Sequence, residues 1–397
     1  MRDRISAVSL AVLAVGLPAA ARAEGPPSEI RIGQTMPYSG PASAYGVIGR
    51  VEAAYIDMIN DKGGINGRKV KFISLDDAYS PPKTVEQTRR LVEQDEVMAV
   101  FGTVGTPTNL AVHKYLNNKK VPQLFVSTGA TIWTEFKKYP WTIGWLPDYE
   151  SEAKIYAKYV LKERPNGKIA ILYQNDDSGR DYLRGFKAGL GADNAKRMIV
   201  AEASYQVSDA TVDSQILTLQ ASGADVLFTH ATPKFGAQAI RKVYEIGWKP
   251  LQLISTNSNT IAGTLAPAGL EKAQGLISAF ILKDPSDSRW HNQPDYQAYL
   301  ALLKKYAPTV DDKDSWAAYG YIAAQGLVKV LEQCGDDLSR ENIMKQARNM
   351  DFTPGMLLPG IKAHTSPDNG YPPIKSMQLS RFEGTNWKPT GEVISGD

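Results

Sequence analysis

Two pairs of adjacent carboxylates are the residues whose type and spacing could do chemistry. They are Asp76 with Asp77 and Asp176 with Asp177, and each pair follows a run typical of a β-strand. Paired carboxylates can act as a general acid and base or bind a divalent cation. The same residues are common where a strand ends and a helix begins, because a carboxylate accepts hydrogen bonds from free backbone N–H groups. With no histidine or third ligand nearby in the sequence, we favour capping.

The usual motifs of enzymes and metal sites are absent from the sequence. It contains no G-x-S-x-G, no P-loop and no G-x-G-x-x-G. The four histidines lie far apart and do not form H-E-x-x-H, and the single cysteine, Cys334, excludes both a C-x-x-C site and an intramolecular disulfide. We therefore expect a protein that is not an enzyme and has no cofactor and no metal.

Three loops rich in hydroxyl groups and glycine are more informative. Each follows a predicted strand and contains no charged residue; they are 37–46, 102–108 and 127–130. Free N–H groups and the positive end of the helix dipole favour an anion at such a helix entry. Plain N-capping by Ser and Thr explains any one loop equally well. The three together leave an anion-binding rim and simple capping as open alternatives.

Aromatic residues accompany these loops: Tyr45, Trp133, Trp141, Trp145 and Tyr149. They suit either a packed core or the walls of a small-molecule site. The sequence does not decide between the two.

Short strand-like runs alternate with amphipathic helices over most of the chain, which predicts an α/β fold with parallel sheets covered on both faces. One α/β unit spans about 28–142 and a second about 143–276. A third stretch, from 277, is mostly helical and is expected to return to the first unit. The predicted strands are 30–35, 70–75, 97–101, 122–126, 168–173, 198–203, 225–229, 251–255, 276–282 and 376–382.

Length and composition agree with a globular protein of two domains. The chain has 397 residues, 43% hydrophobic and 22% charged, with a net charge of +3. No basic stripe indicates a nucleic-acid partner. At the N-terminus, Arg2 and Arg4 precede a short apolar run, and Ala21-Arg22-Ala23 follows Pro18. This pattern predicts a signal peptide over 1–23, because the run is shorter than the roughly 20 residues that span a membrane.

The loops resemble those of the type I periplasmic solute-binding proteins of ABC importers, the Leu/Ile/Val-binding group. The resemblance runs from about Ile30 to Leu358. Its most specific part is Asn60-Asp61-Lys62-Gly63-Gly64-Ile65-Asn66-Gly67; other parts are 36–41, 45–46, 76–78 and 127–129. It implies two Rossmann-like lobes joined by a three-crossing hinge, with a ligand between them. We assign 28–142 plus 277–353 to lobe 1, and 143–276 plus 354–385 to lobe 2.

The resemblance also implies ligand-binding positions. In the first lobe and at the first crossing these are Tyr45, Thr106, Ser127, Thr128, Gly129, Trp145 and Tyr149. In the second lobe they are Thr232 and Asn257, with Asp176 as the one carboxylate that could pair with a ligand ammonium. The amino-acid binders of the group have an acidic residue after the strand at 251–255, where this chain has Ser255-Thr256-Asn257. An unpaired buried ammonium costs several kcal/mol, so an aromatic carboxylate is favoured.

We therefore expect the periplasmic substrate-binding component of an ABC importer, a monomer that captures a small carboxylate and delivers it to an inner-membrane permease. The alternatives are a binding protein for branched-chain or other amino acids, a ligand sensor without a transport role and, least favoured, a secreted hydrolase.

Overall fold

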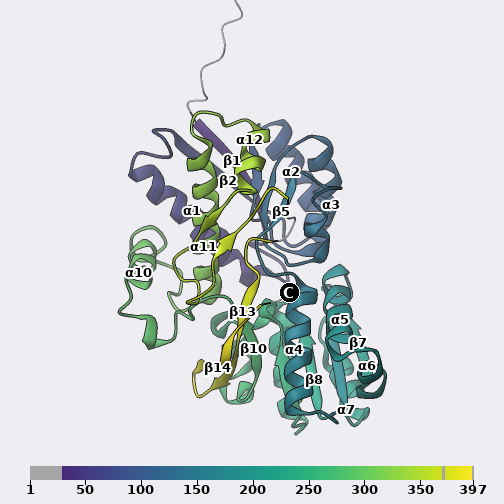
Figure 1. The fold of residues 1–397 in the computed structure, drawn as a ribbon. Coiled ribbons are helices and arrows are strands. Elements are labelled where there is room, and N and C mark those ends of the chain that lie inside the picture. Colours follow the sequence, from purple (N-terminus) through teal and green to yellow (C-terminus); the bar gives the residue numbers. More distant parts are fainter. Residues whose placement is uncertain (1–28, 369–371, 396–397) are drawn as a thin grey trace, which may run out of the picture.

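Two sheets, one after the other along the chain, form the framework of the protein (Figure 1). The computed structural model describes residues 29–368 and 372–395. The first sheet has the order β2-β1-β3-β4-β5 and is parallel throughout. Its strands are β1 (Glu29–Met36), β2 (Lys69–Asp76), β3 (Ala99–Phe101), β4 (Gln123–Val126) and β5 (Thr142–Gly144).

The second sheet has the order β14-β13-β10-β9-β8-β6-β7. Its parallel strands are β6 (Ile169–Gln174), β7 (Ile199–Tyr205), β8 (Val226–His230), β9 (Leu251–Ile254) and β10 (Ile277–Phe280). The strands β13 (Ser376–Glu383) and β14 (Asn386–Ser395) add an antiparallel edge. The predicted α/β class with parallel sheets is thus confirmed, although the sequence analysis missed β5 and β14.

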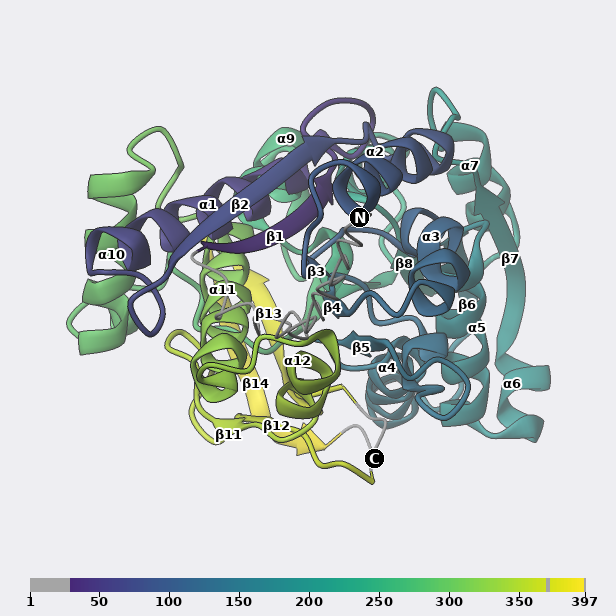
Figure 2. The same ribbon diagram turned by 90° about the horizontal axis from the view of Figure 1, so that it is seen from above.

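Helices cover both faces of each sheet. In the first lobe, α2 (Pro81–Glu93) and α3 (Thr106–Asn118) pack together on one face, and α1 (Gly46–Asp61) and α11 (Ser315–Cys334) pack together on the other. In the second lobe, α4 (Tyr149–Glu163) and α5 (Asp177–Leu190) cover one face, and α7 (Asp213–Ala221) and α8 (Pro233–Glu245) the other. The helices α10 (Pro294–Tyr306) and α6 (Ala192–Met198) lie at opposite sides of the molecule (Figure 2). The helix α12 (Arg340–Ala347) packs against α11, and the short α9 (Ala266–Ala268) packs against α8.

Strand β6 shows why these sequences form buried parallel strands. Ile169 and Ile171 belong to the core beneath α4 and α5, whereas Ala170 and Leu172 belong to the core beneath α7 and α8. Successive side chains of a strand point to opposite faces, so a strand with helices on both sides must be apolar at every position.

The chain passes between the sheets three times: between β5 and α4, between β10 and α10, and between β12 (Ala363–His364) and β13. Two predicted boundaries are corrected by these positions. Ile277–Phe280 pairs with β9 and β13 in the second sheet, so the second crossing follows residue 280 rather than preceding 277. Strand β12 pairs with β11 (Asp351–Phe352), so the third crossing follows 364 rather than 353. In both cases the backbone pairing of a strand carries the lobe further along the chain than the predicted boundary did.

Both sheets reverse their strand order beside their first strand, between β1 and β3 in one lobe and between β6 and β8 in the other. Loops diverge at such a point and leave a crevice at the carboxyl ends of the strands. The predicted signal peptide, residues 1–23, lies outside the described residues. Within those residues no helix has both the length and the apolar character needed to cross a membrane.

A glycine in the loop after β4 packs against the first crossing and cannot carry a side chain. A Cβ atom on Gly129 would lie 2.3 Å from the carbonyl oxygen of Pro147 and 2.8 Å from the ring of Tyr149. On Gly144, the nearest atom to a Cβ would be 3.5 Å away, which is an ordinary contact. The first lobe and the crossing therefore approach one another through Gly129.

We predict that Gly129→Ala lowers the free energy of unfolding by about 1–3 kcal/mol, because backbone must move to admit the methyl group. The matched variant Gly144→Ala is expected to change it by less than about 0.5 kcal/mol. Urea unfolding of both variants measures the difference. Equal stability of the two variants would contradict the close approach.

Candidate ligand-binding site

A cavity lies between the lobes, at the carboxyl ends of both sheets. Its empty volume, including the part open to solvent, is about 490 Å³. Six of the predicted residues line it: Tyr45, Thr106, Ser127, Tyr149, Thr232 and Asn257. We call this space the ligand cavity. The structure thus brings together side chains that lie more than 200 residues apart in the sequence.

The other four predicted residues lie outside this lining. Thr128 is directly behind it, with its hydroxyl 2.6 Å from that of Thr106, and Gly129 packs against Tyr149. Trp145 is fully buried in the core, where its ring contacts Phe125 and Gly326. Asp176 lines a wider hollow beside the ligand cavity, together with Tyr79 and Gln174. Trp145 is therefore a core residue in this structure rather than a wall of the cavity.

The carboxylate pairs at the strand ends have structural partners. Asp176 accepts hydrogen bonds from Gly179 N (3.0 Å) and Ser178 Oγ (2.5 Å) at the start of α5. Asp77 accepts from Tyr79 N and Thr84 Oγ1, and Asp76 from Tyr38 N and Ser39 N. Asp176 thus caps α5, as predicted, whereas Asp76 and Asp77 stabilise the turn after β2 and do not cap a helix. Among the described residues, no three His, Cys, Asp or Glu side chains gather in a way that could hold a metal ion.

A chain of hydrogen bonds crosses the cleft at one side of the ligand cavity. Tyr45 Oη donates to the backbone oxygen of Asn257 (2.7 Å), and Asn257 Nδ2 donates to Tyr149 Oη (2.9 Å). Burial raises the pKa of Tyr149 to about 12 and that of Tyr45 further. Both phenols are therefore neutral at physiological pH. The Tyr45 bond joins the first lobe to the loop after β9, and the Tyr149 bond ties that loop to the start of α4.

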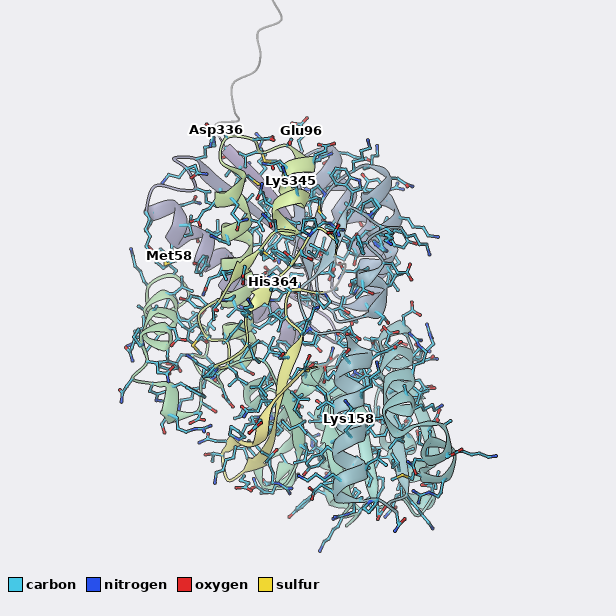
Figure 3. The ribbon with its side chains drawn as sticks, viewed as in Figure 1. Met58, Glu96, Lys158, Asp336, Lys345 and His364 are labelled. Carbon is cyan, nitrogen blue, oxygen red and sulfur yellow. The ribbon has the colours of Figure 1, made fainter. Side chains whose placement is uncertain are left out.

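Glu152, on α4, fixes the position of this loop. Its carboxylate accepts from Thr256 N and Tyr156 Oη (both 2.9 Å) through one oxygen, and from Tyr182 Oη (2.6 Å) and Thr256 Oγ1 (2.9 Å) through the other. Burial raises the pKa of Glu152, and these hydrogen bonds oppose the shift. On the other side of α4, Lys158 is exposed (Figure 3). Glu152 therefore lies on the buried side of α4, and each of its carboxylate oxygens accepts two hydrogen bonds.

A serine and a histidine stand in contact in the second-lobe wall. Ser178 Oγ lies 2.9 Å from His230 Nε2, and His230 Nδ1 lies 3.1 Å from Ser255 Oγ. Because Ser178 donates its hydroxyl proton to Asp176, its oxygen accepts from His230, which makes the histidine a donor. Burial lowers the pKa of His230 to about 3. A neutral histidine that donates to the serine cannot act as its general base.

The cavity wall is free of formal charge. None of its described residues is Asp, Glu, Lys or Arg, and its one histidine, His230, is neutral. Three helices begin at this wall: Thr106 is the first residue of α3, Ser178 lies in the first turn of α5, and Thr232 immediately precedes α8. The positive ends of the α3 and α8 dipoles favour a negatively charged group, whereas that of α5 is already offset by its capping carboxylate, Asp176.

Several wall residues were missed by the sequence analysis. Two of them end strands of the second sheet, Gln174 in β6 and His230 in β8, and Ser178 lies in the first turn of α5, which follows β6. These strands flank the reversal of strand order, so a prediction of the strand order would have identified the residues as candidates. Trp316 and Tyr319 come from α11, where the ring of Trp316 contacts that of Tyr45 at 5.3 Å. The sequence around these two residues does not predict their role, because they reach the cavity only through the path of the chain after the second crossing.

This fold and the cleft between its lobes define a class of two-lobed ligand-binding proteins. Residues 29–385 match the family model described as periplasmic binding protein, and the chain belongs to that family. A Leu/Ile/Val-binding protein homolog 1 from Brucella suis biovar 1 is 25% identical over 326 residues, which cover 79% of this chain and 81% of that protein.

Two solved structures illustrate the range of ligands held by similar folds. A branched-chain amino acid ABC transporter protein from Thermus thermophilus with bound valine has a TM-score of 0.82 at 14% identity, covering 92% of this chain and 96% of that one. A solute-binding protein from R. palustris in complex with benzoate has a TM-score of 0.77 at 19% identity, covering 92% and 98%. Both share the predicted type I fold.

The pKa of His230 predicts a loss of stability in acid. The unfolded chain binds a proton at His230 near pH 6.5, whereas the folded protein does not until about pH 3. Stability therefore falls as the pH drops below 6.5, by about 2 kcal/mol between pH 7.5 and pH 5 from this residue alone. We expect His230→Gln to lose that share of the pH dependence in urea unfolding.

The exposed His364 gives the matched variant, His364→Gln, which should keep the full pH dependence of the wild type. If both variants show the wild-type slope, His230 is protonated in the folded protein and the neutral cavity wall is wrong.

Proposed function

We propose that this protein is the exported substrate-binding component of an ABC importer, and that it captures a small carboxylate, with an aromatic acid favoured, between two closing lobes. It acts as a monomer, uses no cofactor and delivers the ligand to an inner-membrane permease. Membership of the periplasmic binding protein family supports the general role. The nature of the ligand is argued from the cavity wall.

The observation that carries the proposal is the uncharged wall at which three helices begin. A carboxylate there gains from the helix dipoles and from hydroxyl donors at Thr106 and Ser127. Burial of an anion without a cationic side chain is feasible because backbone N–H groups supply its hydrogen bonds. The anion-binding rim suggested by the loops is the first-lobe part of this wall.

An α-amino acid is a poorer fit, because its ammonium needs an acceptor with free capacity. Asp176 already accepts from Ser178, Gly179 and Gln174, and Glu152 uses both oxygens twice. Glu152 could not bind an ammonium without losing a partner, at a cost of about 1–3 kcal/mol. Asp176 keeps one acceptor position on Oδ2, but it does not line the ligand cavity. The valine-bound neighbour shares only the fold with this chain, at 14% identity.

The aromatic preference rests on the rings around the cavity. Tyr45 and Trp316 meet edge to face at 5.3 Å on one side, and Tyr149 and His230 lie 5.9 Å apart on the other. Aromatic ligands gain from such walls beyond simple burial. The neighbour with bound benzoate is an example of the same fold holding an aromatic carboxylate.

The geometry of Ser178 and His230 supports a binding role rather than hydrolysis. The histidine donates to the serine, and its other nitrogen faces a hydroxyl, Ser255, instead of a carboxylate. A hydrolase needs the opposite arrangement, with a base that accepts the proton of its nucleophile.

Export follows from the N-terminal pattern, and it gives a direct prediction. Protein secreted from cells that express the full chain should begin at Glu24, as measured by intact mass and N-terminal sequencing. Protein that retains Met1 after export would overturn the predicted signal peptide.

We predict that benzoate raises the thermal midpoint more than leucine does. At 100 times its Kd a ligand adds about 2.7 kcal/mol to the stability of the folded state. Thr106→Val should weaken benzoate binding by about 1.5–3 kcal/mol, because it removes a hydroxyl that bonds to the carboxylate. Thr218→Val makes the same change on the exposed face of α7 and should leave affinity unaltered.

A larger shift with leucine or valine, abolished by Asp176→Asn, would support the amino-acid alternative and overturn the aromatic assignment. Turnover of an ester or amide by the purified protein would overturn the binding role.

A further inference from the structure

A second cavity lies beside the ligand cavity, at the hinge. Two crossings and the strands beside them contribute to it: Leu146 and Pro147 from the first crossing, Ile281 and Leu282 from the second, Ala279 and Phe280 from β10, and Met377 from the start of β13. Its empty volume, about 470 Å³, is close to that of the ligand cavity. We call this space the hinge cavity.

The two cavities share part of their walls. Leu146, Thr256, Trp316 and Tyr319 line both, and we call these four residues the collar. Tyr319 is held by its hydrogen bond to Ser127 Oγ (3.1 Å) and Thr256 by its bonds to Glu152. The buried indole nitrogen of Trp316 has no partner within the described part of the chain. An unpaired buried donor costs free energy, and a polar atom of a ligand at the collar would supply its partner.

The chemistry of the hinge cavity is that of a hydrocarbon site. Apart from the collar, most of its wall is apolar, including Phe280, Ile281 and Leu282. Besides the collar residues and Ser315, two polar side chains line it, and both already have hydrogen-bond partners. Glu152 accepts four hydrogen bonds, and Asn259 Nδ2 donates to Ser278 Oγ and to Ala279 O. A charged or strongly polar group would lose its hydration there without gaining partners.

We propose that the hinge cavity is a second compartment of the ligand site, which receives the apolar far end of a carboxylate longer than benzoate. The ligand class is then an arylalkanoic acid or an acid of similar length, with its carboxylate among the helix N-termini and its distal carbons beyond the collar. This inference rests on the proposed carboxylate-binding function. It extends that function, because the proposed function leaves the length of the acid open.

The compartment also couples the ligand to closure. A group in the hinge cavity contacts the first two crossings and the start of β13, which follows the third, and the crossings are the segments whose backbone must adjust when the lobes move. A ligand that reaches it gains contacts that exist only in one arrangement of the hinge, which favours that arrangement.

The test is calorimetric titration of the mature protein with benzoate, phenylacetate, 3-phenylpropanoate and 4-phenylbutanoate. Affinity should rise by about fourfold for each methylene until the hinge cavity is filled. Ala279→Leu reduces the space and should lower the ratio of 4-phenylbutanoate to benzoate affinity at least tenfold. Met377→Ala enlarges it and should move the best ligand to a longer chain, which keeps the test valid if Ala279→Leu does not fold.

The outcomes separate the two proposals. Benzoate binding with no gain from chain length, and a ratio unchanged by both variants, overturns the second compartment and leaves the proposed function standing. Independent binding of two ligand molecules makes the hinge cavity a separate site and also overturns it. If none of the four acids binds, the proposed carboxylate-binding function fails, and the inference fails with it.

Discussion

The buried carboxylate of Glu152 is the interaction on which the ligand-binding geometry depends. A carboxylate inside a protein must be surrounded by donors, and these come from Tyr156, Tyr182 and Thr256. Tyr182 in turn stacks on Tyr149 and His230, at 4.6 and 4.2 Å between ring centroids. Thr256 holds the loop that presents Asn257 to Tyr45 across the cleft. Satisfying one charge therefore positions the aromatic wall, the neutral histidine and the contact between the lobes.

Charged and neutral groups occupy different places around the ligand cavity. The carboxylates of Glu152 and Asp176 accept four and three hydrogen bonds from the protein, and neither residue lines the ligand cavity. What lines it are hydroxyls, phenols, amides, a histidine whose pKa burial lowers to about 3, and the starts of three helices. Such a wall attracts an anion through fixed dipoles that need no reorganisation, and it gives a cation no partner.

The segments that form the hinge also contact the cavities. Gly129 allows the first crossing to approach closely, and Tyr149 N donates to Gly129 O (2.7 Å) where α4 begins. The first two crossings and the start of β13 line the hinge cavity, and α11, which follows the second crossing, supplies the rings between the two cavities. Connection, closure and ligand contact thus involve the same short segments.

The sequence by itself determined the α/β class, the parallel strands from β1 to β10 except β5, and the loops that meet at the cleft, because period-two apolar runs and glycine-rich turns are local signals. Tertiary structure alone decided which lobe holds Ile277–Phe280, since backbone pairing and not composition assigns a strand to a sheet. It also decided that Trp145 is core while Trp316 lines the site. The sequence around each tryptophan does not distinguish these two environments. Only the path of the chain in three dimensions buries Trp145 in the core and places Trp316 at the cavity.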